Sequence, residues 1–191
     1  NHVIINRNFY TNGVFNGSDD KDNYARMPFR SNTARFGADF FPSNNTIIGF
    51  VVNGNYNSFE RLGNITTVVN DLSRRPAFWF NTIGTNDDGF NNTVANVNLK
   101  HKLDTTGKEL TADVDYGVFN NRSLTRTASY FFNLNGDKRR PDDILDGDQQ
   151  GKLTLKTAKV DFTNPIKGGA KLEAGVKTSY VSSDNDAKFY N

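Results

Sequence analysis

The sequence has no cysteine, no long apolar run and few aliphatic residues. Without cysteine, disulfide bridges and thiolate metal sites are excluded, although this absence leaves the cellular compartment open. No run of about 18 apolar residues occurs, so the sequence encodes no transmembrane helix. No signal peptide is recognisable, and a mature N-terminus or a piece of a larger protein would both look like this.

The composition that remains is typical of long strands and polar loops. Hydrophobic residues make up 36% and the mean hydropathy is -0.64, whereas aromatic residues reach 13%. A disordered chain would lack these aromatics, and a compact globule would carry more Leu, Ile and Val. The net charge of +2 favours neither nucleic acid nor an acidic partner. We therefore predict an all-β fold.

Strict alternation of apolar and polar residues recurs, whereas helical periodicity is nearly absent. In 109–119, for example, Leu110, Val114 and Val118 share one face and Asp113 lies on the other. In the strand that begins near 152 the apolar positions change phase, which predicts a β-bulge near Lys156 and Thr157. The strands are predicted at approximately 34–41, 46–58, 93–103, 109–119, 152–164 and 170–182, with a partial one near 2–9.

The predicted connections are of two kinds. Short turns at 42–45, 104–107 and 167–169 have the residues of hairpin turns. Long polar loops are predicted at approximately 13–33, 59–92 and 120–151. Short turns at one edge and long loops at the other are the layout of an outer-membrane β-barrel, whose strands need ~9–11 residues to cross the bilayer. The fold predicted is an antiparallel meander of long hairpins, part of such a barrel.

Alternation alone does not separate this barrel from a soluble β-sandwich or adhesin-like binding module with long recognition loops. In the sandwich, Leu110 and Leu172 would lie in a protein core instead of in lipid. Three features favour the barrel: long strands, Ala and Gly on the apolar face, and charged residues such as Asp115, Glu173 and Lys177 on the opposite face. Aromatics near strand ends would also form interfacial girdles.

Four segments carry a family resemblance: 34–41 (ARFGADFF), 45–57 (NTIIGFVVNGNYN), 98–117 (NLKHKLDTTGKELTADVDYG) and 157–189 (TAKVDFTNPIKGGAKLEAGVKTSYVSSDNDAKF). In this order and spacing they resemble the outer-membrane β-barrel family related to TonB-dependent receptors of Gram-negative bacteria. The resemblance implies a large barrel preceded by a carboxypeptidase-regulatory-like domain and a plug. Neither is recognisable here, so residues 1–191 are expected to be a single barrel segment.

The same resemblance implies an outer-membrane location and a role in binding or uptake of a nutrient such as a siderophore, glycan or peptide. The partners it implies are outer-membrane lipid, lipopolysaccharide and, through a plug absent from this chain, the TonB system. No nucleic-acid partner is expected. An isolated segment of a barrel is expected to self-associate through its edge strands.

No catalytic, cofactor-binding or metal site is predicted, and the chain is not expected to be an enzyme. His2 and His101 are far apart, and no nucleophile elbow, Walker loop or His-Glu-x-x-His motif occurs. The pair Asp113 and Asp115 is thinkable for saccharide hydrolysis, but lumen polarity explains it more simply.

Two loop features remain. Clustered carboxylates at Asp142, Asp143, Asp146 and Asp148 are weak candidates for Ca²⁺, but the closing Glu of an EF-hand is missing and a solvated loop is preferred. The neighbouring basic run 138–140 is a candidate for lipopolysaccharide phosphates, although pairing with these aspartates is preferred.

An aromatic cluster lies within the loop predicted at 59–92. Its members, Phe78, Trp79 and Phe80, are candidate ligand contacts or an interface anchor. Alternatively, the loop folds back over them, or the hairpin extends beyond the membrane. The sequence leaves these alternatives open.

Overall fold

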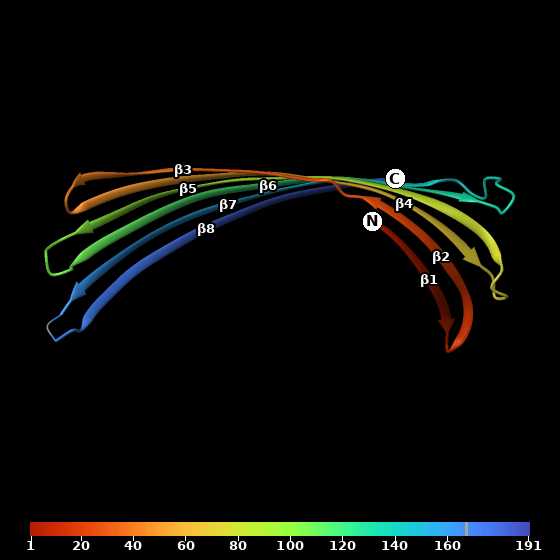
Figure 1. The fold of residues 1–191 in the computed structure, drawn as a ribbon, viewed down its shortest axis with the longest axis horizontal. Coiled ribbons are helices and arrows are strands. Elements are labelled where there is room, and N and C mark those ends of the chain that lie inside the picture. Colours follow the sequence, from red (N-terminus) through yellow and green to blue (C-terminus); the bar gives the residue numbers. More distant parts are fainter. Residues whose placement is uncertain (167) are drawn as a thin grey trace.

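The computed structural model describes residues 1–166 and 168–191 and forms one antiparallel sheet of eight strands (Figure 1). The strands are β1 (His2–Thr11), β2 (Val14–Arg26), β3 (Phe29–Ser43), β4 (Thr46–Asn70), β5 (Pro76–Lys102), β6 (Glu109–Phe132), β7 (Asp143–Pro165) and β8 (Lys171–Tyr190). Their order is β1-β2-β4-β5-β6-β7-β8, and β3 also pairs with β4. Among the described residues, no helix is long and apolar enough to span a bilayer.

Strands β2 and β3 form one path along β4. Arg26 pairs with Leu62 and Phe29 with Phe59, so both sides advance by three residues and the register is kept across the break. Pro28 has no backbone N–H to donate, but its carbonyl oxygen accepts a hydrogen bond from the Glu60 N–H at 3.1 Å. Because β1 returns along β2 only, the outer edge of β3 has no strand partner among the described residues.

The strands are much longer than the sequence predicted, and the long loops predicted at 13–33, 59–92 and 120–151 are wrong. These segments form β2 and the start of β3, the distal halves of β4 and β5, and the distal halves of β6 and β7. The connections at this end are only the Asn12–Gly13 turn and the segments 71–75 and 133–142. Both faces of the distal halves mix polar side chains with scattered apolar ones, so these halves lack the alternation that identifies a strand.

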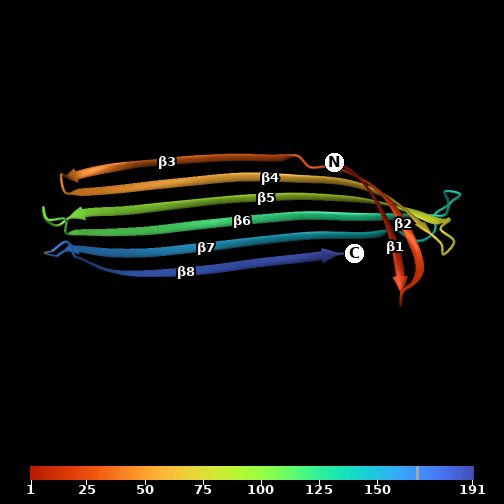
Figure 2. The ribbon, with the colours of Figure 1, turned by 60° about the horizontal axis from the view of Figure 1, so that its bottom comes forward.

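The short turns lie together at the opposite end of the sheet (Figure 2). Turn residues occur at 44–45 and 104–107, as predicted. The predicted turn at 167–169 includes Lys167, which lies outside the described residues. Gly168 and Gly169 have φ values of 87° and 81°, which favour glycine because it has no side chain to clash.

The predicted bulge near Lys156 and Thr157 is wrong. The pairing of β7 with β6 and with β8 runs through both residues without a register shift. The change of phase has another cause: Leu153 and Leu155 point to the polar face, whereas Val160 points to the apolar face. Apolar residues change faces along a regular strand.

The sheet is a single curved layer (Figures 1 and 2). The buried hydrophobic residues among those described are only Ala25, Ala128 and Phe131. A soluble sandwich would bury one face of this sheet against a second sheet, and the described residues form no second sheet. The structure therefore contradicts the sandwich alternative and has the layout of a section of barrel wall.

Candidate functional site

The strand pairings assign every side chain to one of two faces, because directly paired residues share a face. Near the short turns, one face is apolar and is called the outer face; the opposite face is called the inner face. We call the apolar part of the outer face the belt. Its members are Phe36, Ala38, Phe40, Ile48, Phe50, Val52, Ala95, Val97, Leu99, Leu110, Ala112, Val114, Tyr116, Val118, Ala158, Val160, Phe162, Leu172, Ala174, Val176 and Tyr180.

The height of the belt matches a bilayer. On β6 it runs from Leu110 to Val118, about nine residues, which is the length a tilted strand needs to cross. Tyr116 and Tyr180 lie at its distal rim, where amphipathic rings favour the membrane interface. Between them, the Lys156 Nζ lies 5.9 Å from the centre of the Tyr180 ring. The belt thus has the height and the apolar character expected of a lipid-facing surface.

The inner face behind the belt is polar. One row across the sheet consists of Asp39, Gly49, Asn98, Asp113, Lys159 and Lys177. Asn96 Nδ2 donates to Asp115 Oδ1 at 2.7 Å, and Lys159 Nζ lies 2.5 Å from Asp161 Oδ2. Asp113 and Asp115 thus belong to a polar wall, as expected for a lumen.

The glycines of this region are divided between the faces. Gly54 lies on the outer face beside the belt, whereas Gly37, Gly49, Gly117 and Gly175 lie on the inner face. A Cβ at Gly49 would come within 2.6 Å of the Asp39 carboxylate and 2.7 Å of the Asn98 amide. Glycine therefore makes room for longer polar side chains of the neighbouring strands.

Beyond the belt, the outer face becomes charged. We call this distal part of the sheet, approximately 58–70, 76–91, 120–132 and 143–152, the extension. Arg122 Nη2 lies 3.1 Å from Asp148 Oδ2, and Arg126 Nη1 lies 3.6 Å from Asp146 Oδ2. The hydrogen bonds from Arg122 lower the pKa of Asp148. Such a face needs water and is unsuited to hydrocarbon.

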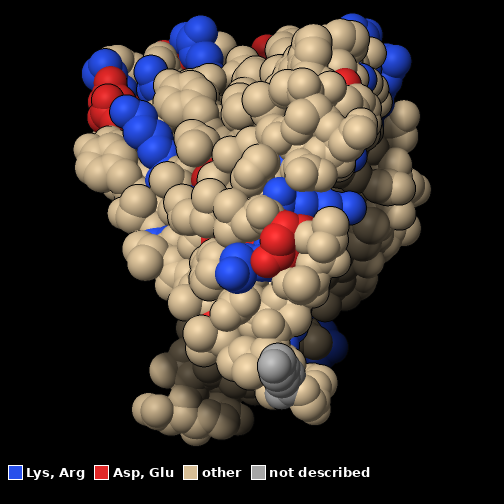
Figure 3. Space-filling view, turned by 90° about the vertical axis from the view of Figure 1, so that its left-hand side faces the viewer, with Lys and Arg blue, Asp and Glu red and all other residues tan. Residues whose placement is uncertain are grey.

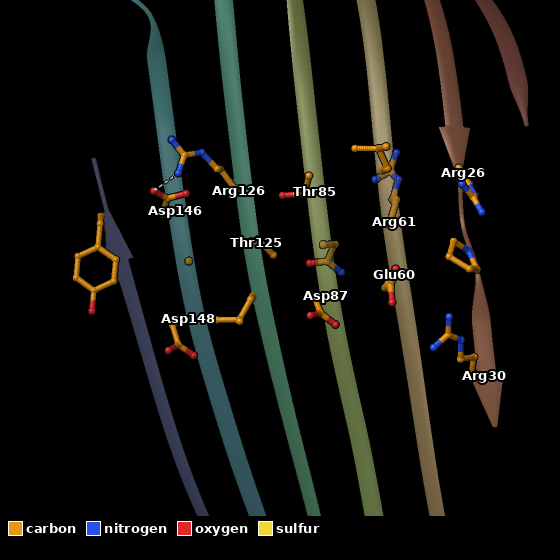
Figure 4. A pocket seen from close by; sticks show the side chains of 16 residues that line it. Arg26, Arg30, Glu60, Arg61, Thr85, Asp87, Thr125, Arg126, Asp146 and Asp148 are labelled. Carbon is orange, nitrogen blue, oxygen red and sulfur yellow. Dashed lines mark ion pairs between the residues drawn. The ribbon is translucent and has the colours of Figure 1, made fainter. Parts of the chain in front are cut away.

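A groove of about 680 Å³ crosses the outer face of the extension (Figure 4). Leu62 and Leu124 contribute apolar surface, Arg26 and Arg30 lie on the β2–β3 side, and the acids Asp146 and Asp148 lie on β7. Asp146 and Asp148 are paired with arginines of β6, so we interpret the groove as a hydrated surface. Charged side chains of both signs are also scattered over the short-turn end (Figure 3).

The predicted aromatic cluster is divided between the faces. Trp79 lies on the outer face and stacks on Phe132 with ring centres 4.4 Å apart. Phe78 and Phe80 lie on the inner face, where Phe80 is 5.2 Å from Phe131. The cluster belongs to β5, so the alternative in which the hairpin extends is the one observed.

Arginines cover the inner part of this cluster. Lys138 forms an isolated antiparallel β-bridge with Phe132, and β7 begins at Asp143. The segment 139–142 between them therefore bulges from the sheet. Arg139 Cζ lies 4.4 Å from the Phe78 ring centre and Arg140 Cζ lies 3.5 Å from that of Phe131. Cations over aromatic faces attract the ring quadrupole. We call this group the distal cluster: Phe78, Phe80, Phe131, Arg139 and Arg140.

The four candidate aspartates are not brought together around a common point. Asp142 pairs with Lys138 at 3.0 Å and Asp143 with Arg140 at 2.6 Å, so the preferred pairing of the basic run is confirmed. Asp146 and Asp148 lie on the outer face of β7 and pair with arginines of β6. Within the described residues, no group of three or more possible metal ligands gathers. His101 Nδ1 lies 2.9 Å from Thr46 Oγ1 near a short turn.

Several inner-face acceptors were not apparent from the sequence. The side-chain oxygens of Asn23, Asn55, Asn57 and Thr67 are buried and have no hydrogen-bond partner among the described residues. All four lie on the inner face. Because buried polar groups normally find partners, this face is suited to water or a polar ligand. Only the strand register shows this, since asparagine is common throughout the sequence.

Comparison with known proteins supports this geometry. Residues 101–191, which contain β6, β7 and β8, match the model of an outer membrane protein beta-barrel family. No curated protein matches the chain. The matched residues include the belt positions of β6, β7 and β8. The chain is therefore an all-β segment of an outer-membrane β-barrel, and it is located in the outer membrane.

Proposed function

We propose that the chain is part of the wall of a TonB-dependent-receptor-like barrel that binds a nutrient, such as a siderophore, glycan or peptide, for uptake across the outer membrane. The observation that carries this proposal is the distal cluster. It places rings and guanidinium groups on the inner face, at the end of the sheet farthest from the short turns. A solute entering from that end would meet these groups first.

The length of the strands supports a binding vestibule. At ~3.4 Å per residue, the 27 residues of β5 span about 90 Å, several times the ~25 Å height of a membrane band. A barrel built only to span the bilayer would not need this extension. The inner wall above the bilayer therefore offers a large polar surface for recognition.

The partners follow from the two faces. The belt would contact lipid, and the charged outer face beside its distal rim would contact lipopolysaccharide. Coupling to the TonB system would require a plug domain. No residue of the chain is proposed as catalytic.

The test is uptake by cells that lack the complete protein and are complemented with wild-type or variant forms. The double variant Phe131→Ala/Arg140→Ala removes the centre of the distal cluster, and Tyr130→Ala, on the outer face of the same strand, is the control. Uptake of one labelled nutrient class should depend on the protein, fall in the double variant and stop with a protonophore. Uptake of siderophore, glycan and peptide probes that is unchanged by deletion would contradict the proposal.

A further inference from the structure

Three phenylalanines form a diagonal stripe on the inner face. The stripe consists of Phe59 on β4, Phe90 on β5 and Phe119 on β6. From one ring to the next, the position moves to the neighbouring strand and two residues closer to the short turns. With strands ~4.8 Å apart and ~3.4 Å per residue, successive positions are about 8 Å apart. Among the described residues these rings do not stack on one another, unlike Phe80 and Phe131. Phe90 is 45% exposed, so the middle ring is accessible to a ligand, whereas Phe59 and Phe119 are half-buried.

Amide side chains flank the middle ring. The row through Phe90 consists of Asn57, Phe90, Asn121, Gly151 and Asn185 on five adjacent strands. A Cβ at Gly151 would collide with the side-chain oxygens of both Asn121 and Asn185. The two amides therefore converge over the bare glycine backbone. The row presents one aromatic surface between hydrogen-bonding groups.

Two acceptors beside the stripe have no partner. Asn55 Nδ2 donates to Thr33 Oγ1 at 2.9 Å, but Asn55 Oδ1 is buried without a partner among the described residues. The same holds for Asn57 Oδ1 in the next inner-face position of β4. A buried acceptor without a hydrogen bond destabilises the fold unless water or a ligand donates to it. The inner face at Asn55 and Asn57 is therefore suited to ligands with hydroxyl or amide donors.

We propose that this surface is a binding track for a neutral saccharide. The members of the track are uncharged: Phe59, Phe90, Phe119, Asn55, Asn57, Asn121 and Asn185. Asp88, which pairs with Phe59 on the same face, is charged, and its carboxylate accepts a hydrogen bond from Asn86 Nδ2 at 2.5 Å. The C–H face of a sugar ring packs on an aromatic ring, and amides exchange hydrogen bonds with its hydroxyls. The proposal rests on the proposed uptake function and names its ligand class.

The chemistry of the track separates a saccharide from the other ligand classes. An anionic chelate would favour the arginines of the distal cluster, which lie apart from the track. An extended peptide binds most readily along an unpaired strand edge, whereas β4, β5 and β6 are paired on both sides. A neutral polyhydroxyl ligand can bind without a charged side chain and without an unpaired strand edge.

The experiment measures binding of neutral oligosaccharides to the complete protein in detergent micelles by titration calorimetry. The probes are malto-, cello-, xylo-, manno- and chito-oligosaccharides, with a ferric siderophore and a mixed peptide pool as comparison classes. Phe90→Ala should weaken saccharide binding at least about tenfold, whereas Phe90→Tyr should retain it within about threefold. Asn121→Ala should weaken it by a similar factor. The controls Tyr56→Ala and Asn120→Ala remove matched side chains on the outer face and should leave binding unchanged.

The outcomes are distinct. Saccharide binding that is lost in Phe90→Ala and kept in the outer-face controls supports the track. Saccharide binding that is unchanged in both Phe90→Ala and Asn121→Ala overturns it. If only the siderophore or peptide pool binds, the track is wrong while the proposed uptake function stands. If no probe binds and deletion leaves uptake unchanged, both proposals fail.

Discussion

Asp19 shows how a single ion pair anchors the N-terminal hairpin. The residue is only 5% exposed, and it accepts hydrogen bonds from Arg7 Nε at 2.9 Å and Arg7 Nη2 at 2.5 Å. The hydrogen bonds from Arg7 lower the pKa of Asp19, because they stabilise its charged form. The pair joins β1 to β2 next to the extension, since Asp19 pairs with Val69 of β4.

This shift predicts a pH dependence of stability. A carboxyl group with a lowered pKa stabilises the fold above its ordinary pKa, and the contribution is lost as the pH falls through the lowered value. Asp19→Asn should decrease the free energy of unfolding by about 1–3 kcal/mol at neutral pH. The measurement is denaturant unfolding in micelles from neutral to acidic pH. The difference in free energy of unfolding between the wild type and Asp19→Asn should decrease at acidic pH. A difference that increases would contradict the role of Asp19.

At the scale of the element, one strand crosses two environments. On the outer face of β6, Val114 lies in the belt and Leu124 lies in the charged extension. Val114→Arg should lower the free energy of unfolding in lipid by about 2–4 kcal/mol, since the charge would meet hydrocarbon. Leu124→Arg should change it by about 0.5 kcal/mol or less, because its surroundings are hydrated.

Thr111→Arg provides a second control on the same strand, because Thr111 lies on the inner face at the height of the belt. The measurement is reversible unfolding in phospholipid vesicles. Equal losses from Val114→Arg and Leu124→Arg would show that the belt and the extension meet the same solvent, and the assignment of the belt would then be wrong.

The same division explains what the sequence could predict. The segment 109–119 alternates because one face meets lipid and the other a polar lumen, so its strand was recognisable. Residues 120–123, Asn-Asn-Arg-Ser, are polar on both faces and carry no alternation although they continue β6. The distal halves were therefore predicted as loops. The division of Phe78 and Trp79 between faces, and the inner-face track, depend on register between distant strands and had no local signal.

At the scale of the whole molecule, the sheet has open edges. The outer edge of β8 and that of β3 have no strand partner among the described residues, and the β1–β2 hairpin bends away from the main sheet (Figure 1). Unpaired backbone groups at long edges favour pairing with another chain. The 191-residue chain on its own should therefore self-associate in detergent.

Light scattering coupled to size-exclusion chromatography measures the mass of the assembly that the isolated chain forms. The complete barrel, which closes its edges, serves as the monomeric control. Backbone amides of β8 should become more protected from hydrogen exchange as the concentration of the isolated chain rises. A monodisperse monomer in which both terminal edges are already protected would contradict the prediction.

The most direct test of the membrane assignment uses the absence of native cysteine. Single cysteines are placed at each position from 110 to 130 of β6, labelled with a nitroxide, and probed in lipid vesicles with oxygen and a water-soluble nickel chelate. Even-numbered positions from 110 to 118 should be oxygen-accessible and odd-numbered ones nickel-accessible, whereas from 120 to 127 both faces should be nickel-accessible. Oxygen accessibility that continues along the even positions beyond 120, or nickel accessibility at Val114, would contradict the account.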